Sequence, residues 1–385
     1  MAAALRLRRL LLLLPGLHLG GTERHGLDLA RRLATQGIDV TLAAEPSLLD
    51  TLPQAGLALR TAAIGWDESL PAEANIARQQ AALSPLLAEA APDAVLLSLP
   101  WPNAGLGLQA GLAETHLPRL VLLHLATEGP APPGIAAICA RLGLDASVLA
   151  AVSAPVARRA AGFFGLDQAR IGVLHNPAPL AAPMDRTTAR QAVRQRLGLP
   201  ASAPVLLFLG RLEEAKGADL LPGIGDRLGA TLAIGGEGAL RGMLEARALA
   251  DPRGLFRVLG PLPDPALWLA GADALLLPSR LEGAPLVFLE AAAQRCPVIA
   301  TAAALEALGP TAPAMARIVA TPEVAPFAAA AQALLADSAS TGAMLDAAEA
   351  HARARSPAAA LKATLGLLRA AVLRATLALP QETPA

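Results

Sequence analysis

The sequence is poor in the side chains that stack on nucleic-acid bases. Aromatic residues make up only 2% of the 385 residues, and tyrosine is absent. Platforms for single-stranded nucleic acid depend on such rings, so their scarcity disfavours that function. The charge balance gives no support for a polyanionic partner either, because Lys+Arg and Asp+Glu both number 32. We therefore expect no nucleic-acid partner.

Cysteine is also scarce. Cys139 and Cys296 are the only cysteines, and they lie in different halves of the chain. This predicts buried thiols of a reduced, cytoplasmic protein rather than a disulfide framework. The six histidines and two cysteines show no metal-ligand spacing. We expect no bound metal and no cofactor.

Long apolar runs are missing as well. No stretch reaches the roughly 18 to 20 uninterrupted apolar residues of a transmembrane helix. The first residues, MAAALRLRRLLLLLPGLHLGG, are similar to a signal peptide, but the apolar run is short and no small-residue cleavage site follows. We expect a buried first strand that runs into a glycine turn.

What the chain does have is a regular alternation of short apolar runs and longer amphipathic segments. In the helix expected over 21–37, apolar residues recur at 3.6-residue spacing and Gly37 stops the pattern. Such a βα repeat predicts a parallel sheet with helices on both faces. The expected strands of the first half are 7–15, 38–44, 93–99, 119–125 and 146–153.

A change of composition divides the chain. Prolines at 177, 179 and 183 predict a stiff linker near 177–184, after which a second strand series begins. We predict two Rossmann-like domains, 1–176 and 177–355. The helical stretch 356–379 either stays on the second domain or packs back on the first. The second strand series comprises 204–211, 229–238, 256–262, 272–279 and 296–301.

Ligands of doubly wound sheets bind beyond the carboxyl ends of the strands, so the segments after each strand carry the candidate site. Gly20 and Gly21 follow the first strand, where they allow a sharp turn and a close approach to a ligand. The helix that begins near Thr22 points its free N–H groups at the same spot. An ordinary glycine turn would look the same.

Two cations follow the first strand of the second half. Arg211 comes directly after this strand, and Lys216 follows in the same loop, before Gly217. Arginine as a bidentate fork and lysine as a point charge make a good diphosphate clamp. Lysine is otherwise rare, since Lys362 is the only other one. The alternative is a solvated surface pair.

Two glutamates flank the start of a helix in the stretch PSRLEGAPLVFLEAAAQ. Glu282 lies in a loop after the strand, and Pro285 suits the first turn of a helix that carries Glu290. Glu290 is flanked by apolar residues and needs a hydrogen-bonding partner if it is buried, such as ribose hydroxyls. Glu282 could reach a further hydroxyl of a donor sugar. The predicted phosphate-facing backbone of this loop is that of Gly283, Ala284 and Leu286.

Together the motifs GGTER, GRLEEAKGADLL, IGGEG, ADALLLPSRLEGAPLVFLEA and PVIAT resemble a GT-B glycosyltransferase of the large retaining family 4, over roughly residues 10–301. The resemblance implies two facing Rossmann-like domains with parallel sheets. The second would hold the nucleotide-sugar donor and the first the acceptor.

The resemblance also implies residue roles. Arg211 and Lys216 would hold the diphosphate, Glu290 the ribose, and Glu282 the donor sugar. Gly20 and Gly21 would approach the phosphates. His124, at the end of the 119–125 strand, matches a histidine that contacts the sugar in many members. The predicted catalytic set is therefore Glu282, His124, Arg211 and Lys216.

Two departures from the family pattern leave the lining of the donor pocket open. Where the family has a glycine two residues before the proline of PVIAT, this chain has Arg295. After PVIAT, a glycine pair before an acidic residue is replaced by AAALEA.

The function that we expect is retaining transfer of a sugar from a nucleotide-diphosphate sugar, with UDP- and GDP-sugars as the implied donors. No Asp-x-Asp occurs, so we expect the cations and the helix N-terminus to stabilise the leaving diphosphate without a metal. Two alternatives stay open, a nucleotide-sugar epimerase of GT-B fold and a catalytically silent nucleotide-binding homologue. A dehydrogenase is disfavoured because no GxGxxG follows a strand.

We expect the acceptor to be a glycan, a lipid-linked molecule or a small molecule, as in cell-envelope glycan biosynthesis. Arginines concentrate near the N-terminus, and a basic, leucine-rich face could rest on an anionic membrane. A solvated face of a cytoplasmic protein explains them equally well. These arginines are Arg6, Arg8, Arg9, Arg24, Arg31 and Arg32.

Overall fold

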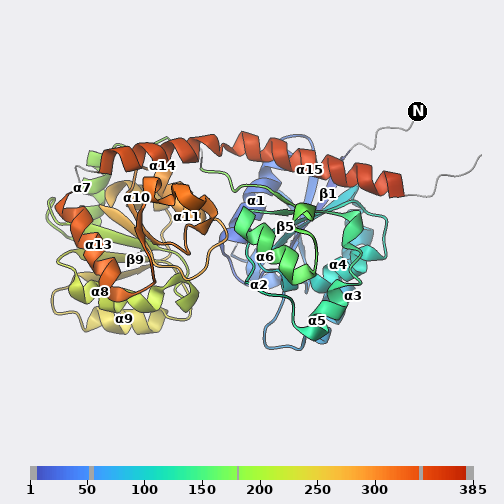
Figure 1. Ribbon diagram of the computed structural model, residues 1–385, viewed down its shortest axis with the longest axis horizontal. Coiled ribbons are helices and arrows are strands. Elements are labelled where there is room, and N and C mark those ends of the chain that lie inside the picture. The colour runs from blue at the N-terminus through green and yellow to red at the C-terminus, as the bar shows by residue number, and fades with distance from the viewer. Residues whose placement is uncertain (1–6, 52–55, 180–181, 338–340, 379–385) are drawn as a thin grey trace, which may run out of the picture. The chain divides into compact units, whose positions relative to one another are not determined.

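The computed structural model describes residues 7–51, 56–179, 182–337 and 341–378, and the chain divides into two compact α/β units. The first comprises Met1–Asn176 together with Ala358–Ala385, and the second comprises Pro177–Pro357. Each unit contains a parallel sheet flanked by helices (Figure 1).

The first unit is built on a seven-stranded parallel sheet of order β3-β2-β1-β4-β5-β6-β7. The N-terminal leucine run is an inner strand between β2 and β4, and Leu10–Leu14 are at most 1% exposed, as the sequence predicted. The strands are β1 Arg9–Leu14, β2 Asp39–Ala44, β3 Ala58–Thr61, β4 Ala94–Leu99, β5 Arg119–Leu123, β6 Ser147–Ala151 and β7 Ile171–Val173.

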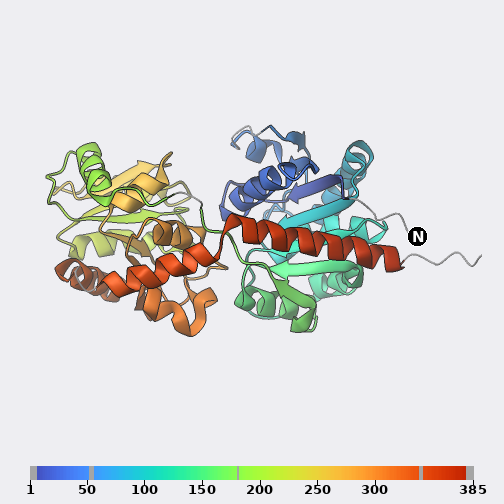
Figure 2. The same ribbon diagram turned by 90° about the horizontal axis from the view of Figure 1, so that it is seen from above.

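Helices of the first unit bury apolar stripes against this sheet. In α1, Leu27, Ala30 and Leu33 are buried at helical spacing. The last helix, α15, packs on this unit, where Leu368 and Ala371 are fully buried and Arg374 Nη1 donates to the Ser147 carbonyl at 3.0 Å (Figure 2). The helices are α1 Gly21–Ala34, α2 Pro46–Leu49, α3 Ala72–Ala90, α4 Leu106–Ala113, α5 Pro133–Cys139, α6 Ala154–Phe164 and α15 Pro357–Ala378, with short 3₁₀ turns at Pro102–Gly105, Leu144–Ala146 and Gln168–Arg170.

The second unit has a six-stranded parallel sheet of order β10-β9-β8-β11-β12-β13. Its strands are β8 Val205–Leu209, β9 Thr231–Gly235, β10 Phe256–Gly260, β11 Ala274–Leu277, β12 Val298–Thr301 and β13 Arg317–Val319. Its helices are α7 Arg186–Leu197, α8 Leu221–Arg227, α9 Arg241–Leu249, α10 Pro265–Gly271, α11 Leu286–Ala293, α12 Ala312–Met315, α13 Val324–Ala336 and α14 Gly342–Ala354, with 3₁₀ turns η4 Glu214–Lys216, η5 Ala218–Leu220 and η6 Glu306–Thr311.

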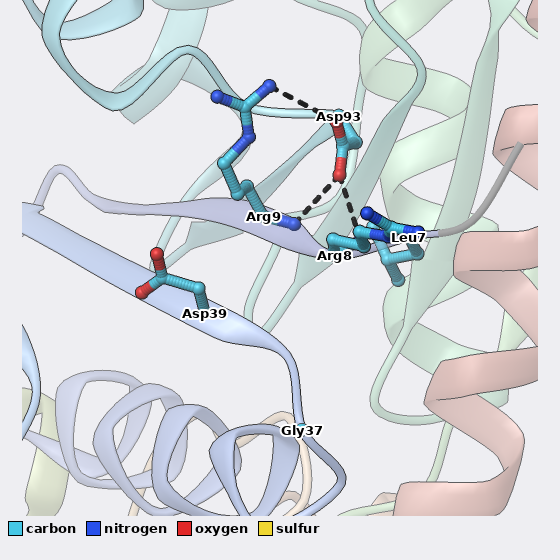
Figure 3. A pocket seen from close by; sticks show the side chains of 6 residues that line it. All are labelled: Leu7, Arg8, Arg9, Gly37, Asp39 and Asp93. Atoms are coloured by element: carbon cyan, nitrogen blue, oxygen red, sulfur yellow. Dashed lines mark hydrogen bonds and ion pairs between the residues drawn. The ribbon is translucent and has the colours of Figure 1, made fainter.

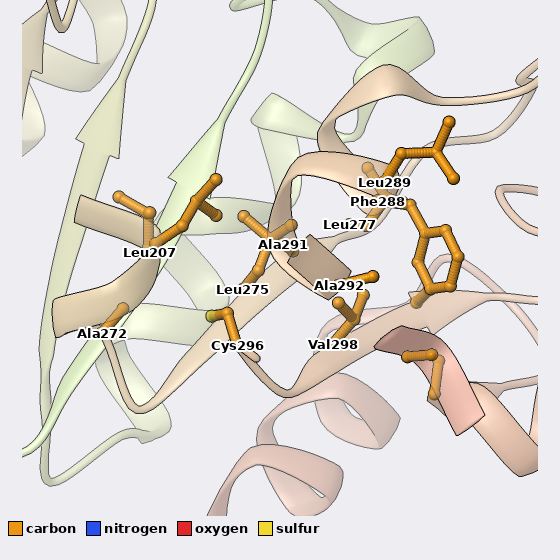
Figure 4. Close-up of a cluster of buried hydrophobic side chains, with 14 of the residues drawn as sticks. Leu207, Ala272, Leu275, Leu277, Phe288, Leu289, Ala291, Ala292, Cys296 and Val298 are labelled. Carbon is orange, nitrogen blue, oxygen red and sulfur yellow. The ribbon is translucent and has the colours of Figure 1, made fainter. Parts of the chain in front are cut away.

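Both faces of this second sheet are buried in apolar cores. Alternate strand residues point to opposite faces, so Leu207 and Leu275 belong to one cluster (Figure 4), whereas Leu206 and Leu276 belong to the other. Burial on both faces explains why the strands of a parallel sheet read as continuous apolar runs.

The predicted fold class is confirmed, and every strand that the sequence predicted is present, with ends that differ by at most three residues. Three short edge strands, β3, β7 and β13, were not predicted. Cys139 and Cys296 are both free and buried.

One helical stretch in the described part of the chain is long and apolar enough to cross a membrane by length and composition. It is Gly342–Leu377, with a mean hydropathy of 1.2 in its most apolar window, of which 28% is buried. The sequence prediction had required an uninterrupted apolar run, which this stretch lacks. A core helix of a soluble protein passes the same test, so the observation is weak evidence for a membrane span.

Candidate active site

Each sheet has one point at which the strand order reverses. In the first sheet this point lies between β1 and β4, and in the second between β8 and β11. Ligands of such sheets bind at this crevice, outside the carboxyl ends of the strands. The segments that follow β1, β8 and β11 contain most of the predicted site residues, and His124 follows β5, the neighbour of β4.

Arg211 lies in the loop directly after β8. Its side chain is 40% exposed, and Nη1 donates to Glu213 Oε1 at 3.0 Å. The backbone around it is held by the end of β9 and the loop that follows, because Gly210 N–H donates to the Gly235 carbonyl at 3.1 Å and Leu212 N–H to the Glu237 carbonyl at 2.7 Å. The backbone of Arg211 is therefore held in place by hydrogen bonds, while its guanidinium group is accessible to solvent.

The glycines of IGGEG make this bracing possible. Gly236 has a φ of 140°, and a Cβ there would lie 1.8 Å from the Gly210 carbonyl oxygen. A Cβ on Gly238, with a φ of 153°, would lie 2.6 Å from the Leu212 carbonyl oxygen. From the sequence, IGGEG was one of the motifs that carry the family resemblance. The structure shows that its glycines allow a backbone-to-backbone contact that side chains would prevent.

Lys216 and Glu282 are brought together as an ion pair. Lys216 Nζ lies 2.6 Å from Glu282 Oε1, and the two side chains are only 20% and 10% exposed. Ser279 Oγ donates to the same carboxylate oxygen at 2.9 Å. Ser279 is itself fully buried, and its carbonyl accepts from Thr301 Oγ1 at the end of β12 at 2.5 Å. The pair thus joins the loops after β8 and β11, and hydrogen bonds connect it to β12.

The same two loops also touch through backbone. Gly217 has a φ of 72°, and a Cβ there would lie 2.3 Å from the Pro278 carbonyl oxygen. Arg280 N–H donates to the Ala215 carbonyl at 2.9 Å, and the Arg280 guanidinium binds both carboxylate oxygens of Asp219 at 2.7 and 2.8 Å. Lys216 is therefore held by its neighbours on both sides, which the lysine-glycine pair in the sequence did not reveal.

Helix α11 begins at Leu286, one residue later than predicted, with Pro285 as its N-cap. Gly283 is buried, Ala284 and Leu286 are half-buried, and all three lie at the amino end of this helix. Glu290 is the fifth residue of α11 and is half-buried, beside the buried Leu289 and Ala291. The predicted donor-binding backbone thus lies in the loop after β11 and at the first residue of α11, the helix that carries Glu290.

In the first unit, the glycine loop after β1 is closed by a glutamate of GGTER. Glu23 is 4% exposed, and its Oε2 accepts from the N–H of Gly20 at 2.8 Å. Gly21 is the first residue of α1, with Gly20 as N-cap. A Cβ on Gly16 would lie 2.1 Å from Glu23 Oε1, so the loop accepts the buried carboxylate only because residue 16 has no side chain. Sequence reasoning did not single out Glu23 or Gly16.

His124 follows β5 and is held by two neighbours. Its Nε2 lies 3.0 Å from Ser98 Oγ on β4, and the His25 ring of α1 stands edge-on to it with ring centroids 5.2 Å apart. Burial lowers the pKa of His124 well below its ordinary value, and the proximity of His25 lowers it further. Burial likewise lowers the pKa of His25 to about 4, partly opposed by Asp28. Both rings are therefore neutral near pH 7.

Comparison with known proteins identifies the family. Residues 203–337 match the model described as "Glycosyl transferases group 1", and residues 19–181 match the model "Glycosyltransferase Family 4". A D-inositol 3-phosphate glycosyltransferase of a Nocardioides species is 30% identical, over 74% of this chain and 70% of that protein. The chain belongs to glycosyltransferase family 4.

Other similar proteins agree with this. A D-inositol 3-phosphate glycosyltransferase of Thermomonospora curvata is 29% identical over 74% of this chain and 75% of that protein. A Rickettsia africae glycosyltransferase has a TM-score of 0.76 at 15% identity, covering 95% of this chain and 98% of that one. Anabaena Alr3699/HepE, solved in complex with UDP, has a TM-score of 0.72 at 18% identity, covering 94% and 100%. The protein is thus a glycosyltransferase of GT-B fold.

One departure of this glycosyltransferase from its family pattern has a structural account. Arg295 has a left-handed backbone with a φ of 51°, which a glycine would adopt without strain. Its guanidinium compensates by binding α14, where it pairs with Asp346 at 2.8 Å and with Glu349. The end of helix α11 is thereby bound to α14.

No cluster suited to a metal ion occurs in residues 7–51, 56–179, 182–337 and 341–378, where no group of three or more His, Cys, Asp or Glu side chains gathers. A hollow of about 800 Å³ lies elsewhere in the first unit of the glycosyltransferase, at the edge where β1 starts (Figure 3). There Asp93 Oδ2 accepts from the backbone N–H groups of Arg8 and Arg9 at 2.8 Å each. This is the edge opposite the carboxyl ends of the strands, so the hollow is separate from the candidate active site.

The N-terminal arginines do not lie at one place on the first unit. Arg8 and Arg9 precede and begin β1, and Arg31 and Arg32 end α1, which returns toward the same edge of the sheet. Arg24 lies at the start of α1, near the opposite edge. Arg9 pairs with Asp93 and Arg32 with Asp28. Arg6 lies outside the described residues.

Proposed function

We propose that this glycosyltransferase moves a sugar from a nucleoside-diphosphate sugar to an acceptor hydroxyl, with retention at the anomeric carbon and without a metal. The observation that carries the proposal is the set of charged groups at the switch point of the second sheet. Arg211 and Lys216 follow β8, while Glu282 and Glu290 follow β11. That crevice is where nucleotides bind in doubly wound sheets.

In this proposal, each group meets the part of the donor that its chemistry suits. Arg211 and Lys216 attract the diphosphate, and the backbone of Gly283, Ala284 and Leu286 offers N–H groups and the helix dipole of α11. Glu290 accepts hydrogen bonds from the ribose hydroxyls. Glu282 receives a hydroxyl of the donor sugar. The family resemblance further assigns Gly20 and Gly21 to the phosphates and His124 to the sugar.

The reaction then needs no group outside the donor, the acceptor and these residues. The bond between the anomeric carbon and the diphosphate oxygen breaks, and the negative charge that develops on the diphosphate is stabilised by the two cations. The acceptor oxygen attacks the face from which the diphosphate departs, and its proton passes to the leaving diphosphate. A neutral His124 suits this step, because a positively charged imidazole ring would repel the positive charge that develops on the sugar. Finding the inverted anomer by NMR would refute the same-face attack.

UDP- and GDP-sugars are the proposed donors, and the Anabaena neighbour solved with UDP supports the first. For the acceptor, the relatives named D-inositol 3-phosphate glycosyltransferase support a phosphorylated polyol as the first compound to assay, beside glycan and lipid-linked acceptors. A cytoplasmic site of action with peripheral membrane contact remains part of the proposal. Co-sedimentation with anionic vesicles at low salt tests that contact.

The deciding experiment is a thermal-shift panel of UDP, GDP, ADP and CDP, each with magnesium or with EDTA. A ligand at about 100 times its dissociation constant stabilises the folded state by about 2.7 kcal/mol, which is a readable shift. We expect one nucleotide to raise the melting temperature equally under both conditions, and Arg211→Ala to remove the shift. A shift that needs magnesium would refute the metal-free mechanism. Sugar conversion without any acceptor would instead identify an epimerase.

A further inference from the structure

The ion pair between Lys216 and Glu282 joins a predicted diphosphate ligand to a predicted sugar ligand. Nζ and Oε1 lie 2.6 Å apart, and both side chains are largely buried. The inference drawn from this pair rests on the proposed function. In that function, Lys216 must give its positive charge to the diphosphate, yet in the structure a carboxylate already holds it. The two anions therefore compete for one ammonium group.

The surroundings show that Glu282 would stay in place when Lys216 turns to the diphosphate. Ser279 Oγ donates to the same Oε1 at 2.9 Å, so this oxygen keeps a partner after the lysine leaves. Ser279 is fully buried, and Thr301 Oγ1 holds its carbonyl at 2.5 Å. Thr301 is fixed in turn by the N–H of Ala304, which donates to Oγ1 at 2.9 Å. Ser279 is thus a positioning residue for Glu282.

Lys216, by contrast, is fixed mainly at its backbone, and the partner of its head group among the described residues is Glu282. Its N–H donates to the Glu213 carbonyl at 3.1 Å, and Gly217 beside it touches Pro278. The long side chain can change partners while the loop stays where it is. Among the described residues, Glu282 makes its hydrogen bonds through Oε1, so Oε2 remains for a donor hydroxyl.

We propose that Glu282 is an internal competitor of the nucleoside diphosphate for Lys216, and that this competition speeds product release. While the donor is bound, its sugar hydroxyl engages Glu282, so competition for the lysine is weakened. After transfer the sugar is gone, the carboxylate regains Lys216, and the diphosphate loses one of its two cations. Glu282 thus lowers the affinity for the nucleoside diphosphate product, the spent nucleotide, relative to the affinity for the nucleotide sugar.

The test is the affinity for the spent nucleotide alone, measured by calorimetry in EDTA with UDP, or with GDP if the thermal-shift panel selects it. Glu282→Gln keeps the shape but removes the charge, so we expect the dissociation constant to fall by about three- to tenfold. In a Lys216→Met background, the same substitution is expected to have no effect. This double-mutant cycle attributes the gain to the lysine.

The matched control is Asp219→Asn. Asp219 pairs with Arg280 in the neighbouring turn, so this variant also removes one carboxylate from the region but frees no predicted diphosphate ligand. Its dissociation constant is therefore expected not to fall below that of the wild type. In the same preparations, nucleotide dissociation from Glu282→Gln is expected to slow by the same factor by which affinity rises.

Three results would overturn the inference. Unchanged or weaker nucleotide binding by Glu282→Gln would remove the competition, as would an equal gain in the Lys216→Met background or in Asp219→Asn. If Glu282→Gln does not fold, Glu282→Asp draws the carboxylate back from Lys216 and must change affinity in the same direction. Failure of the wild-type protein to bind any nucleoside diphosphate would instead refute the proposed function itself, and the inference with it.

Discussion

Replacing Gly217 by alanine tests whether the two loops that carry Lys216 and Glu282 depend on their close backbone contact. The added Cβ would lie 2.3 Å from the Pro278 carbonyl oxygen, and the φ of 72° is left-handed. The left-handed backbone costs an alanine about 1–2 kcal/mol. Displacing a backbone segment costs about 1–3 kcal/mol more, as in other overpacked sites. We expect a total loss of about 2–5 kcal/mol in the free energy of unfolding.

Gly198 provides the matched control. It ends α7 in the same unit with a φ of 67°, and a Cβ there would meet nothing within 4 Å. Gly198→Ala should therefore lose only the backbone contribution of about 1–2 kcal/mol and bind the nucleotide normally. Urea unfolding and nucleotide affinity are measured on both variants. Equal losses of stability and unchanged affinity in Gly217→Ala would refute the idea that this contact positions Lys216.

Three further predictions concern single residues. Arg295→Gly relieves the left-handed strain that Arg295→Ala keeps, and both lose the ion pairs to α14, so urea unfolding should find the glycine variant more stable by about 1 kcal/mol. In Gly16→Ala the added Cβ would lie 2.1 Å from Glu23 Oε1, so the free energy of unfolding should fall by about 1–3 kcal/mol and the transfer rate should fall as well. In the control Gly134→Ala the added Cβ meets nothing within 4 Å, so both quantities should stay unchanged. Burial lowers the pKa of His25 from 6.5 to about 4, so between pH 6.5 and pH 4 the unfolded state binds a proton that the folded state does not. As the pH falls through this window, the wild type should lose about 3 kcal/mol more of its free energy of unfolding than His25→Phe. Parallel pH curves for the two proteins would show that His25 is solvated.

Much of the fold could be predicted from the sequence because the central strands are buried on both faces. Runs such as Leu10–Leu14 and Ala274–Leu277 have no polar alternation and stand out between amphipathic segments. The edge strands β3 and β7 carry exposed residues and span only four and three residues. Their pattern is too short to separate them from loops, so only the sheet pairing reveals them.

The candidate site could be located from the sequence but not assembled from it. Strand ends and glycines marked the loops of Arg211, Lys216 and Glu282, because parallel strands deliver their carboxyl ends to one edge. The supporting contacts join segments that are far apart in the chain, such as Ser279 with Thr301 and Ser98 with His124. Single serine, threonine and histidine residues form no recognisable sequence motif. Their hydrogen-bond partners lie in other segments and become known only from the folded structure.

The placement of α15 bears on how the protein is made. The first unit consists of Met1–Asn176 and Ala358–Ala385, so the whole second unit is inserted between its two parts. During synthesis, the second unit can fold as soon as its own residues have left the ribosome. The first unit lacks the buried side chains of Leu368 and Ala371 until residues 358–378 have been synthesised. A chain that ends at Pro357 would therefore hold a complete second unit and a first unit that still exposes the apolar surface that α15 covers.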